Sequence, residues 1–256
     1  DLMALFHAPF KVGEYQLPVP IALGLCRNLD GAKSGLDLLK RVNVALNHAK
    51  RSLSTHHEYY LATMEENTRQ RVEIIRRLRL DFQAEKLQVW YQPQIVLATG
   101  DVVGIEALIR WRHPEYGLVS PARFIPLAEE NGLIASIGEW VLRSACRQAA
   151  RWQRDGLALR TAVNLSPLQF KAPGLLTSIR AILDETGLAP SLLELEITES
   201  GLMQNSDANL ATLSALRDLG IRLGLDDFGT GYSSMSYLKQ LPFTHIKVDQ
   251  AFVQGL

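Results

Sequence analysis

The sequence has 256 residues, of which 47% are hydrophobic and 21% are charged, so it can bury the apolar core of a folded protein. Lysine plus arginine and aspartate plus glutamate both total 27, and this balance leaves no overall field to attract DNA or an anionic membrane. No apolar stretch reaches the ~18 residues of a membrane span, and residues 1–4 do not start a signal peptide. We therefore expect no nucleic-acid polymer as a partner and no membrane segment within these residues.

The two cysteines, Cys26 and Cys146, are far apart in the sequence and lie in apolar surroundings. This pattern favours reduced thiols over a disulfide framework, and no Cys/His spacing of a zinc site is present. The sequence therefore predicts a cytoplasmic location for these residues, whether or not the whole protein is tethered to a membrane.

Residues 1–56 predict a small α/β region. An extended run from Tyr15 to Leu25 precedes an amphipathic stretch from Leu36 to Lys50, whose apolar residues recur at helical spacing. Residues 57–86 are charged, contain neither glycine nor proline and keep a helical period, which predicts a connecting helix. An ordinary packed helix within one continuous domain would fit the same periodicity.

From Leu87 onward, short β-rich runs alternate with long amphipathic stretches, a pattern typical of parallel strands joined by crossover helices. The predicted strands are Val102–Ile109, Thr161–Leu165, Leu193–Thr198, Ile221–Asp226 and Thr244–Asp249. The predicted helices lie within Phe124–Gln153, which has room for two, Leu175–Glu185 and Ala208–Leu219. This alternation predicts an α/β fold.

Polar residues break the apolar pattern of these strands. Strands of a parallel sheet that is covered on both faces are normally apolar, so such exceptions are informative. In one strand Glu194, Glu196 and Thr198 alternate with apolar residues and therefore share one face. The exceptions in the other strands are Glu106, Arg110, Asn164, Asp226, Asp227, Lys247 and Asp249. Converging buried carboxylates repel one another, so they imply protonation, basic partners or bound cations.

Metal binding is the simplest of these explanations, because only Arg110 and Lys247 are local cations. Carboxylate and amide oxygens suit hard cations such as Mg²⁺, Mn²⁺ or Ca²⁺. The adjacent Asp226 and Asp227 could bridge two ions, and a two-metal site can activate water for attack on a phosphodiester. The following segment, Phe228 to Ser234, would supply a flexible loop that could contact phosphate.

Each of these residues also has an ordinary structural explanation. Glu106 could be a surface ion-pair member, Asp226 and Asp227 could form a turn, and Lys247 could extend into solvent. The recurrence of polar groups at the carboxyl ends of five strands favours an enzyme, because barrel enzymes place their chemistry there.

The order of the motifs resembles the EAL family of cyclic di-GMP phosphodiesterases. The matching segments are Tyr91-Gln92-Pro93, Glu106-Ala107-Leu108, Asn164-Leu165-Ser166, Glu196-Ile197-Thr198-Glu199-Ser200, Asp226-Asp227-Phe228-Gly229-Thr230-Gly231 and Lys247-Val248-Asp249. The resemblance implies a TIM-like (β/α) barrel that hydrolyses cyclic di-GMP to linear pGpG in bacterial second-messenger signalling. It also implies a homodimer.

The resemblance assigns a role to each candidate site residue. The implied metal ligands are Glu106, Asn164, Glu196 and Asp226, with Asp226 and Asp227 serving a second ion. The implied catalytic residues are Lys247 at the water or metal centre, Asp227, and Glu199, which would hold the loop after Asp227. The implied substrate contacts are Gln92, Arg110 and Asp249. The expected cofactors are two Mg²⁺ or Mn²⁺ ions, with Ca²⁺ inhibitory or non-productive.

Both ends of the chain depart from a complete EAL domain. Residues 20–24 and 41–50 resemble the tail of a GGDEF (diguanylate cyclase) domain, although an unrelated α/β region is the alternative. The GGDEF signature itself is absent, so we expect no synthesis of the messenger. We therefore predict a divergent GGDEF-like part at 1–56, a connecting helix at 57–86 and an EAL-type domain at 87–256. The last two strands of the barrel, with a later catalytic glutamate and a strand-end glutamine, are expected to be missing.

Two other functions compete with catalysis. A non-catalytic receptor would bind cyclic di-GMP and signal through the helix at 57–86, and a structural domain would bind neither metal nor nucleotide. The complete set of predicted metal ligands favours the phosphodiesterase.

Overall fold

The computed structural model describes residues 6, 8–19, 21–27, 31–51, 57–202, 206–229, 241–249 and 252. The chain forms two compact units, Asp1–Arg76 and Arg77–Leu256. The boundary between the units falls inside helix α2 (Ala62–Gln83), which covers most of the predicted connecting helix. The predicted division at residues 56 and 86 stays a prediction.

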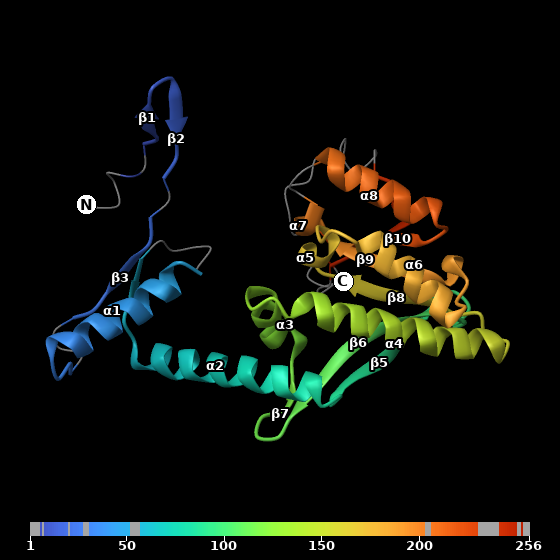
Figure 1. The fold of residues 1–256 in the computed structure, drawn as a ribbon, viewed down its shortest axis with the longest axis horizontal. Helices are drawn as coiled ribbons and strands as arrows, with labels where there is room; N and C mark the ends of the chain where they lie inside the picture. Colours follow the sequence, from blue (N-terminus) through green and yellow to red (C-terminus); the bar gives the residue numbers. More distant parts are fainter. Residues whose placement is uncertain are drawn as a thin grey trace. The chain divides into compact units, whose positions relative to one another are not determined.

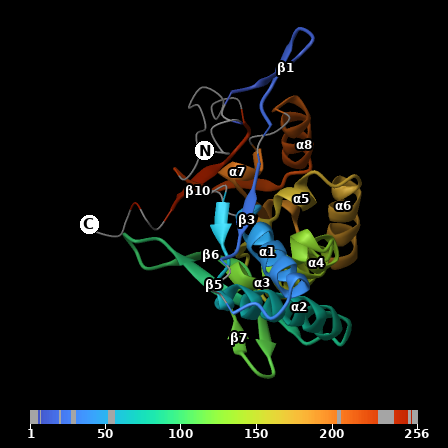
Figure 2. The same cartoon turned by 90° about the vertical axis from the view of Figure 1, so that its left-hand side faces the viewer.

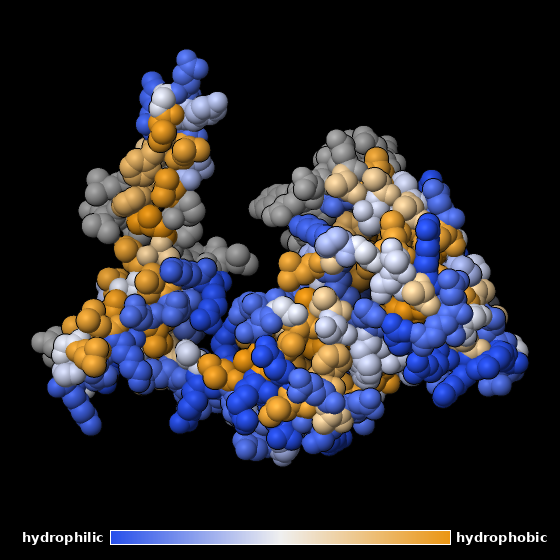
Figure 3. Space-filling view, viewed as in Figure 1, coloured by the Kyte–Doolittle hydropathy of each residue, from blue (hydrophilic) through white to orange (hydrophobic). Residues whose placement is uncertain are grey.

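The first unit contains short strands and one packed helix. Strands β1 (Phe10–Val12) and β2 (Tyr15–Leu17) form an antiparallel hairpin, whose exposed apolar side chains appear in Figure 3. Strand β3 (Leu23–Leu25) pairs in parallel with β4 (His57–Tyr59). The predicted extended run is therefore divided between β2 and β3.

The predicted amphipathic helix of the first unit is confirmed as α1 (Gly35–Ala49). The Ser34 hydroxyl caps its first turn by accepting a hydrogen bond from the backbone N–H of Asp37. On the inner side of α1, Ala45 packs with Tyr60 and Met64 in a small buried cluster. Both cysteines are free, as predicted.

The second unit is built on one seven-stranded sheet (Figure 1). Its strands are β5 (Leu87–Ile95), β6 (Val102–His113), β7 (Gly117–Val119), β8 (Arg160–Leu165), β9 (Leu193–Thr198), β10 (Arg222–Phe228) and β11 (His245–Val248). The order is β11-β10-β9-β8-β6-β5, with β7 paired to β6. Strands β6 and β8 to β11 are parallel, whereas β5 and β7 run antiparallel to β6.

Helices connect the parallel strands, as predicted. They are α3 (Pro121–Glu130), α4 (Ile134–Arg154), α5 (Pro167–Phe170), α6 (Leu175–Thr186), the 3-10 helix η3 (Pro190–Leu192), α7 (Glu199–Leu202) and α8 (Ser206–Asp218). Helices α4, α6 and α8 lie along one face of the sheet (Figures 1 and 2). Beneath them, Leu193, Leu195 and Ile197 of β9 are fully buried. The alternating Glu194 and Glu196 therefore point to the opposite face, here called the inner face.

The predicted barrel is seen as an open sheet with β5 and β11 at its edges, within the part of the chain that the structure describes. Strand β5 was not among the predicted strands, and it contains Pro93, a residue that is rare in central strands. Its position at the edge of the sheet explains how the proline is tolerated. None of the helices among the described residues is long and apolar enough to cross a membrane.

Candidate metal and catalytic site

Five neighbouring strands bring one polar side chain each to a common point on the inner face. The ammonium of Lys247 from β11 lies 3.1 Å from Glu106 of β6, 2.8 Å from Glu196 of β9 and 3.4 Å from Asp226 of β10. Asn164 of β8 donates a hydrogen bond of 2.8 Å to the other oxygen of Glu106. We call these five residues the carboxylate cluster, and it contains all four of the predicted primary metal ligands.

The register of the strands explains this convergence. Asn164 is paired with Glu196, and Glu196 is paired with Gly224 of the next strand. Asp226 lies two residues beyond Gly224 and therefore on the same face of the sheet. The polar pattern of each strand thus predicted that these side chains lie close together. The distances between them depend on the register of the strands.

The carboxylate cluster has more negative than positive charge. Burial raises the pKa of Glu196 to about 7; the Lys247 hydrogen bond opposes this shift, while Glu106 and Asp226 add to it. Burial also acts to lower the pKa of Lys247, but its contacts with the carboxylates outweigh burial and raise that pKa. Lys247 is therefore a permanent cation among three acids. A single ammonium cannot balance three carboxylates in their ionised form.

The donor set fits a hard divalent cation. One carboxylate oxygen of Glu196, Oε1, is buried and has no hydrogen-bond partner in the described part of the chain. Asn164 uses its amide nitrogen toward Glu106, which leaves its amide oxygen as a potential ligand. Oxygen-only sites of this kind suit Mg²⁺, Mn²⁺ or Ca²⁺.

The chain turns sharply at the end of β10. Asp227 has a φ of 55°, and its partial burial together with Asp226 and Asp249 raises its pKa. The buried Glu199, at the start of α7, accepts a hydrogen bond of 3.0 Å from the backbone N–H of Gly229. This contact lies where a residue that holds the chain after Asp227 was expected. Residues 230–234 of the predicted loop lie outside the described residues.

The predicted substrate contacts are placed differently from one another. Gln92 of β5 is paired in register with Glu106 and therefore adjoins the carboxylate cluster. Arg110 lies near the C-terminal end of β6. The Cζ atom of its guanidinium is 5.7 Å from the centroid of the Trp90 ring. Asp249 follows the last residue of β11.

A cavity of about 380 Å³ adjoins the carboxylate cluster and is lined by both Asn164 and Arg110. Its walls are largely apolar and come from β6, α3, α4 and the segment around α5. Glu129 of α3 also lines it, and burial raises the pKa of this carboxyl although Ser166 partly opposes the shift. Glu129 was not predicted as a site residue, because the periodicity of its segment indicates only a helix.

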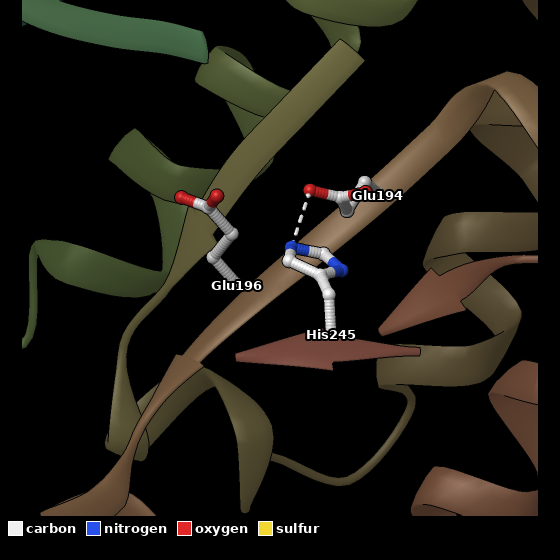
Figure 4. Close-up of side chains that lie close together, drawn as sticks. All are labelled: Glu194, Glu196 and His245. Atoms are coloured by element: carbon white, nitrogen blue, oxygen red, sulfur yellow. Dashed lines mark ion pairs between the residues drawn. The ribbon is translucent and has the colours of Figure 1, made fainter. Parts of the chain in front are cut away.

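A second polar group lies deeper on the inner face, below the carboxylate cluster. Its centre is Glu194, whose side chain is fully buried. His245 lies 3.0 Å from Glu194, as drawn in Figure 4, while Arg160 lies 3.2 Å and Arg222 3.6 Å away. We call these four residues the inner network. The alternation of β9 predicted that Glu194 shares a face with Glu196, but its three partners were not predicted, because they come from other strands.

Comparison with known proteins identifies relatives along the whole chain. Residues 75–256 match the family described as the EAL domain. The chain is 42% identical over 255 residues to an uncharacterized signaling protein of Caulobacter vibrioides and 38% identical over 256 residues to MucR of Pseudomonas aeruginosa, named as a bifunctional diguanylate cyclase/cyclic di-GMP phosphodiesterase. Both alignments cover 100% of this chain but only 31% and 37% of the relatives, so the chain spans about a third of their length.

A solved structure is also similar. It is the PaMucR phosphodiesterase in complex with c-di-GMP, with a TM-score of 0.69 and 47% sequence identity. The similarity covers 71% of this chain and 74% of that one.

Proposed function

Because this chain belongs to the EAL domain family, we propose that it hydrolyses cyclic di-GMP to linear pGpG in a metal-dependent reaction. The observation that carries the proposal is the meeting of Glu106, Glu196 and Asp226 from separate strands around Lys247. The similarity to MucR and to its c-di-GMP complex supports this choice of substrate.

Glu106, Asn164, Glu196 and Asp226 would hold Mg²⁺ or Mn²⁺, with Asp227 beside Asp226 for a second ion. When bound, such ions lower the pKa of a water molecule and neutralise charge on the phosphodiester. Lys247 supplies a fixed positive charge and hydrogen-bond donors beside the ligands, suited to orienting a water or a phosphate oxygen. Ca²⁺ would occupy the site without supporting turnover.

The neighbouring cavity would receive part of the dinucleotide. Its apolar walls suit a purine ring, and the Glu129 carboxyl can accept hydrogen bonds from the N–H groups of guanine. Arg110 at the edge of the cavity offers a planar cation for a phosphate or a base. Gln92 of β5 and Asp249 after β11 would complete the contacts from the two opposite edges of the sheet.

We also propose that residues 1–56 derive from a GGDEF-like domain. The alignment with MucR, which is named as a diguanylate cyclase as well as a phosphodiesterase, includes these residues and supports the assignment. The homodimer and the cytoplasmic location remain predictions.

Incubation of the protein with cyclic di-GMP and Mg²⁺ or Mn²⁺, followed by chromatography of the products, tests the proposed activity. We expect pGpG from the wild type and none from Asp226→Asn, whereas Asp155→Asn, the same change at the exposed end of α4, should retain activity. Absence of pGpG from the wild type would reject the proposal. Tight calorimetric binding without turnover would instead establish the receptor function, and absence of both would leave a structural domain.

A further inference from the structure

Each network residue of β8 to β11 shares its strand and its face with a member of the carboxylate cluster. Glu194 precedes Glu196 by two residues on β9, and His245 precedes Lys247 by two on β11. On β8 and β10, Arg160 and Arg222 precede Asn164 and Asp226 by an even number of residues. Because side chains alternate along a strand, the inner network forms the layer directly beneath the carboxylate cluster.

The imidazole of His245 is oriented from both sides. Its Nε2 lies 3.0 Å from a carboxylate oxygen of Glu194, and its Nδ1 lies 3.2 Å from the hydroxyl of Thr244. The Thr244 hydroxyl in turn donates to the backbone carbonyl of Leu223 on β10. The ring is thus connected to β9 on one side and to β10 on the other.

Glycine at position 224 makes room for this ring. A Cβ added to Gly224 would lie 2.8 Å from two ring atoms of His245 and 3.5 Å from the Cγ of Glu196. Carbon and nitrogen atoms do not approach so closely without displacement of one of them. Gly224 therefore allows His245 to reach Glu194 across β10.

We propose that Glu194 and His245 form a positioning pair that sets the spacing of β9 and β11, so that Glu196 and Lys247 meet with the geometry that metal binding requires. This inference rests on the proposed function for its catalytic readout, but its metal-binding readout is independent of turnover. Groups outside the ligand set that orient metal ligands commonly contribute about 10–100-fold to metal affinity or activity. We expect the loss of this pair to have an effect of roughly that order of magnitude.

Direct ligation of an ion by the deeper residues is the competing explanation. One ligand atom each of Glu194, Glu196 and His245 lie within 4.8 Å of one another, close enough for a shared cation (Figure 4). However, the guanidinium groups of Arg160 and Arg222 already flank Glu194 and would repel a cation placed beside it. The charges therefore favour positioning over ligation.

The first test measures Mn²⁺ binding to metal-stripped protein by electron paramagnetic resonance. We expect His245→Ala to weaken Mn²⁺ binding about tenfold. Ile246→Ala, a truncation on the same strand but on its outer, half-exposed face, should change binding by less than about twofold. A lower melting temperature of His245→Ala with unchanged Mn²⁺ affinity would reduce the pair to a structural role and overturn the proposal.

The second test uses the close approach at position 224. Gly224→Ala should also weaken Mn²⁺ binding, because the new methyl group displaces the imidazole. In the double variant with His245→Ala, the two losses should not multiply, since the group that the methyl displaces is gone. Multiplying losses would show that the two positions act independently and would contradict the proposed coupling.

Two further readouts separate the remaining outcomes. Electron spin echo modulation from a coordinated histidine nitrogen, present in wild type and lost in His245→Ala, would establish direct ligation and overturn positioning. For His245→Ala acting on cyclic di-GMP, a positioning role predicts a kcat about tenfold lower than that of the wild type. The KM of this variant should stay within about twofold of the wild-type value. If the wild type does not turn over the dinucleotide while the Mn²⁺ effects are observed, the proposed function fails and the positioning pair stands.

Discussion

The carboxylate cluster and the inner network differ in their balance of charge, although strands β8 to β11 carry residues of both. In the carboxylate cluster, three acids share the single ammonium of Lys247. In the inner network, the single acid Glu194 has two arginines and a histidine around it. Burial acts to raise the pKa of Glu194, but His245 and the arginines outweigh it and lower that pKa. The deficit of positive charge, rather than the proximity of acids alone, therefore distinguishes the carboxylate cluster as the proposed cation site.

The largest difference should appear when the same change is made in both layers. Glu196→Gln removes the charge of a proposed metal ligand and should lower kcat on the order of 10²–10³-fold. Glu194→Gln keeps the shape of the side chain and should lower kcat only about tenfold, as an orienting residue would. Steady-state kinetics with cyclic di-GMP and Mn²⁺ measure both. Equal losses in the two variants would break the proposed distinction between the layers.

Replacement of Lys247 should reveal the charge imbalance of the carboxylate cluster as a loss of stability. Lys247→Met leaves the three carboxylates without their cation, and we expect the metal-free protein to lose on the order of 2–4 kcal/mol. Because a divalent ion can replace the missing charge, Mn²⁺ should raise the melting temperature of this variant more than that of the wild type. Calorimetric melting with and without Mn²⁺ checks this expectation. An equal response of both proteins to Mn²⁺ would count against a cation site at Lys247.

Asp81 of α2 is another buried acid with nearby positive charge, and it tests whether such a group outside the site also stabilises the fold without affecting metal binding. Asp81 contacts Arg77 at 3.0 Å and accepts a hydrogen bond of 3.1 Å from the indole of Trp111. Burial acts to raise the pKa of Asp81, but the hydrogen bonds from Arg77 and Trp111, together with the positive charges of Arg77 and Lys86, outweigh it and lower the pKa below the ordinary value of 3.8. The lowered pKa means that the carboxylate stabilises the fold above this value and loses its contribution as the pH falls below it.

We therefore expect Asp81→Asn to lower the free energy of unfolding by about 1–3 kcal/mol at neutral pH. The loss should shrink in denaturant titrations below the ordinary pKa of 3.8, where the Asp81 carboxyl of the unfolded chain begins to bind a proton while that of the folded protein stays ionised to lower pH. Mn²⁺ affinity should stay unchanged. A constant loss at every pH would show that packing, and not the ionised carboxylate, gives Asp81 its effect.

The smallest expected effect concerns the cavity beside the carboxylate cluster. Glu129→Gln replaces one of the two acceptor oxygens by an NH2 donor, so the side chain can no longer offer one oxygen to each of two guanine N–H groups, and KM should rise about fivefold, equivalent to ~1 kcal/mol. The value of kcat should change little, because the reacting groups are untouched. Glu130→Gln, the same substitution at the exposed neighbouring position, serves as the control. An unchanged KM in Glu129→Gln would remove this carboxyl from the substrate contacts.

The gathering of the site was predictable from the sequence because alternation fixes the face of each polar residue, and the carboxyl ends of parallel strands lie together. Its internal contacts were not. The distance of 2.8 Å between Lys247 and Glu196 depends on the pairing of strands that no local pattern specifies. For the same reason the Asp81–Trp111 hydrogen bond, between residues 30 positions apart, was not foreseen. Strand β5 contains Pro93, which as a local signal disfavours a strand. The proline is tolerated because β5 pairs only with β6, at the edge of the sheet, and this position is not visible in the local sequence.

The backbone at Asp227 has a consequence for the evolution of this protein. With a φ of 55°, this residue adopts a conformation that glycine would occupy at lower cost, by about 1 kcal/mol. Glycine, however, would remove the carboxylate next to Asp226. The protein thus retains a small, permanent loss of stability at this turn, and a search for more stable variants would select Asp227→Gly at the expense of the second carboxylate.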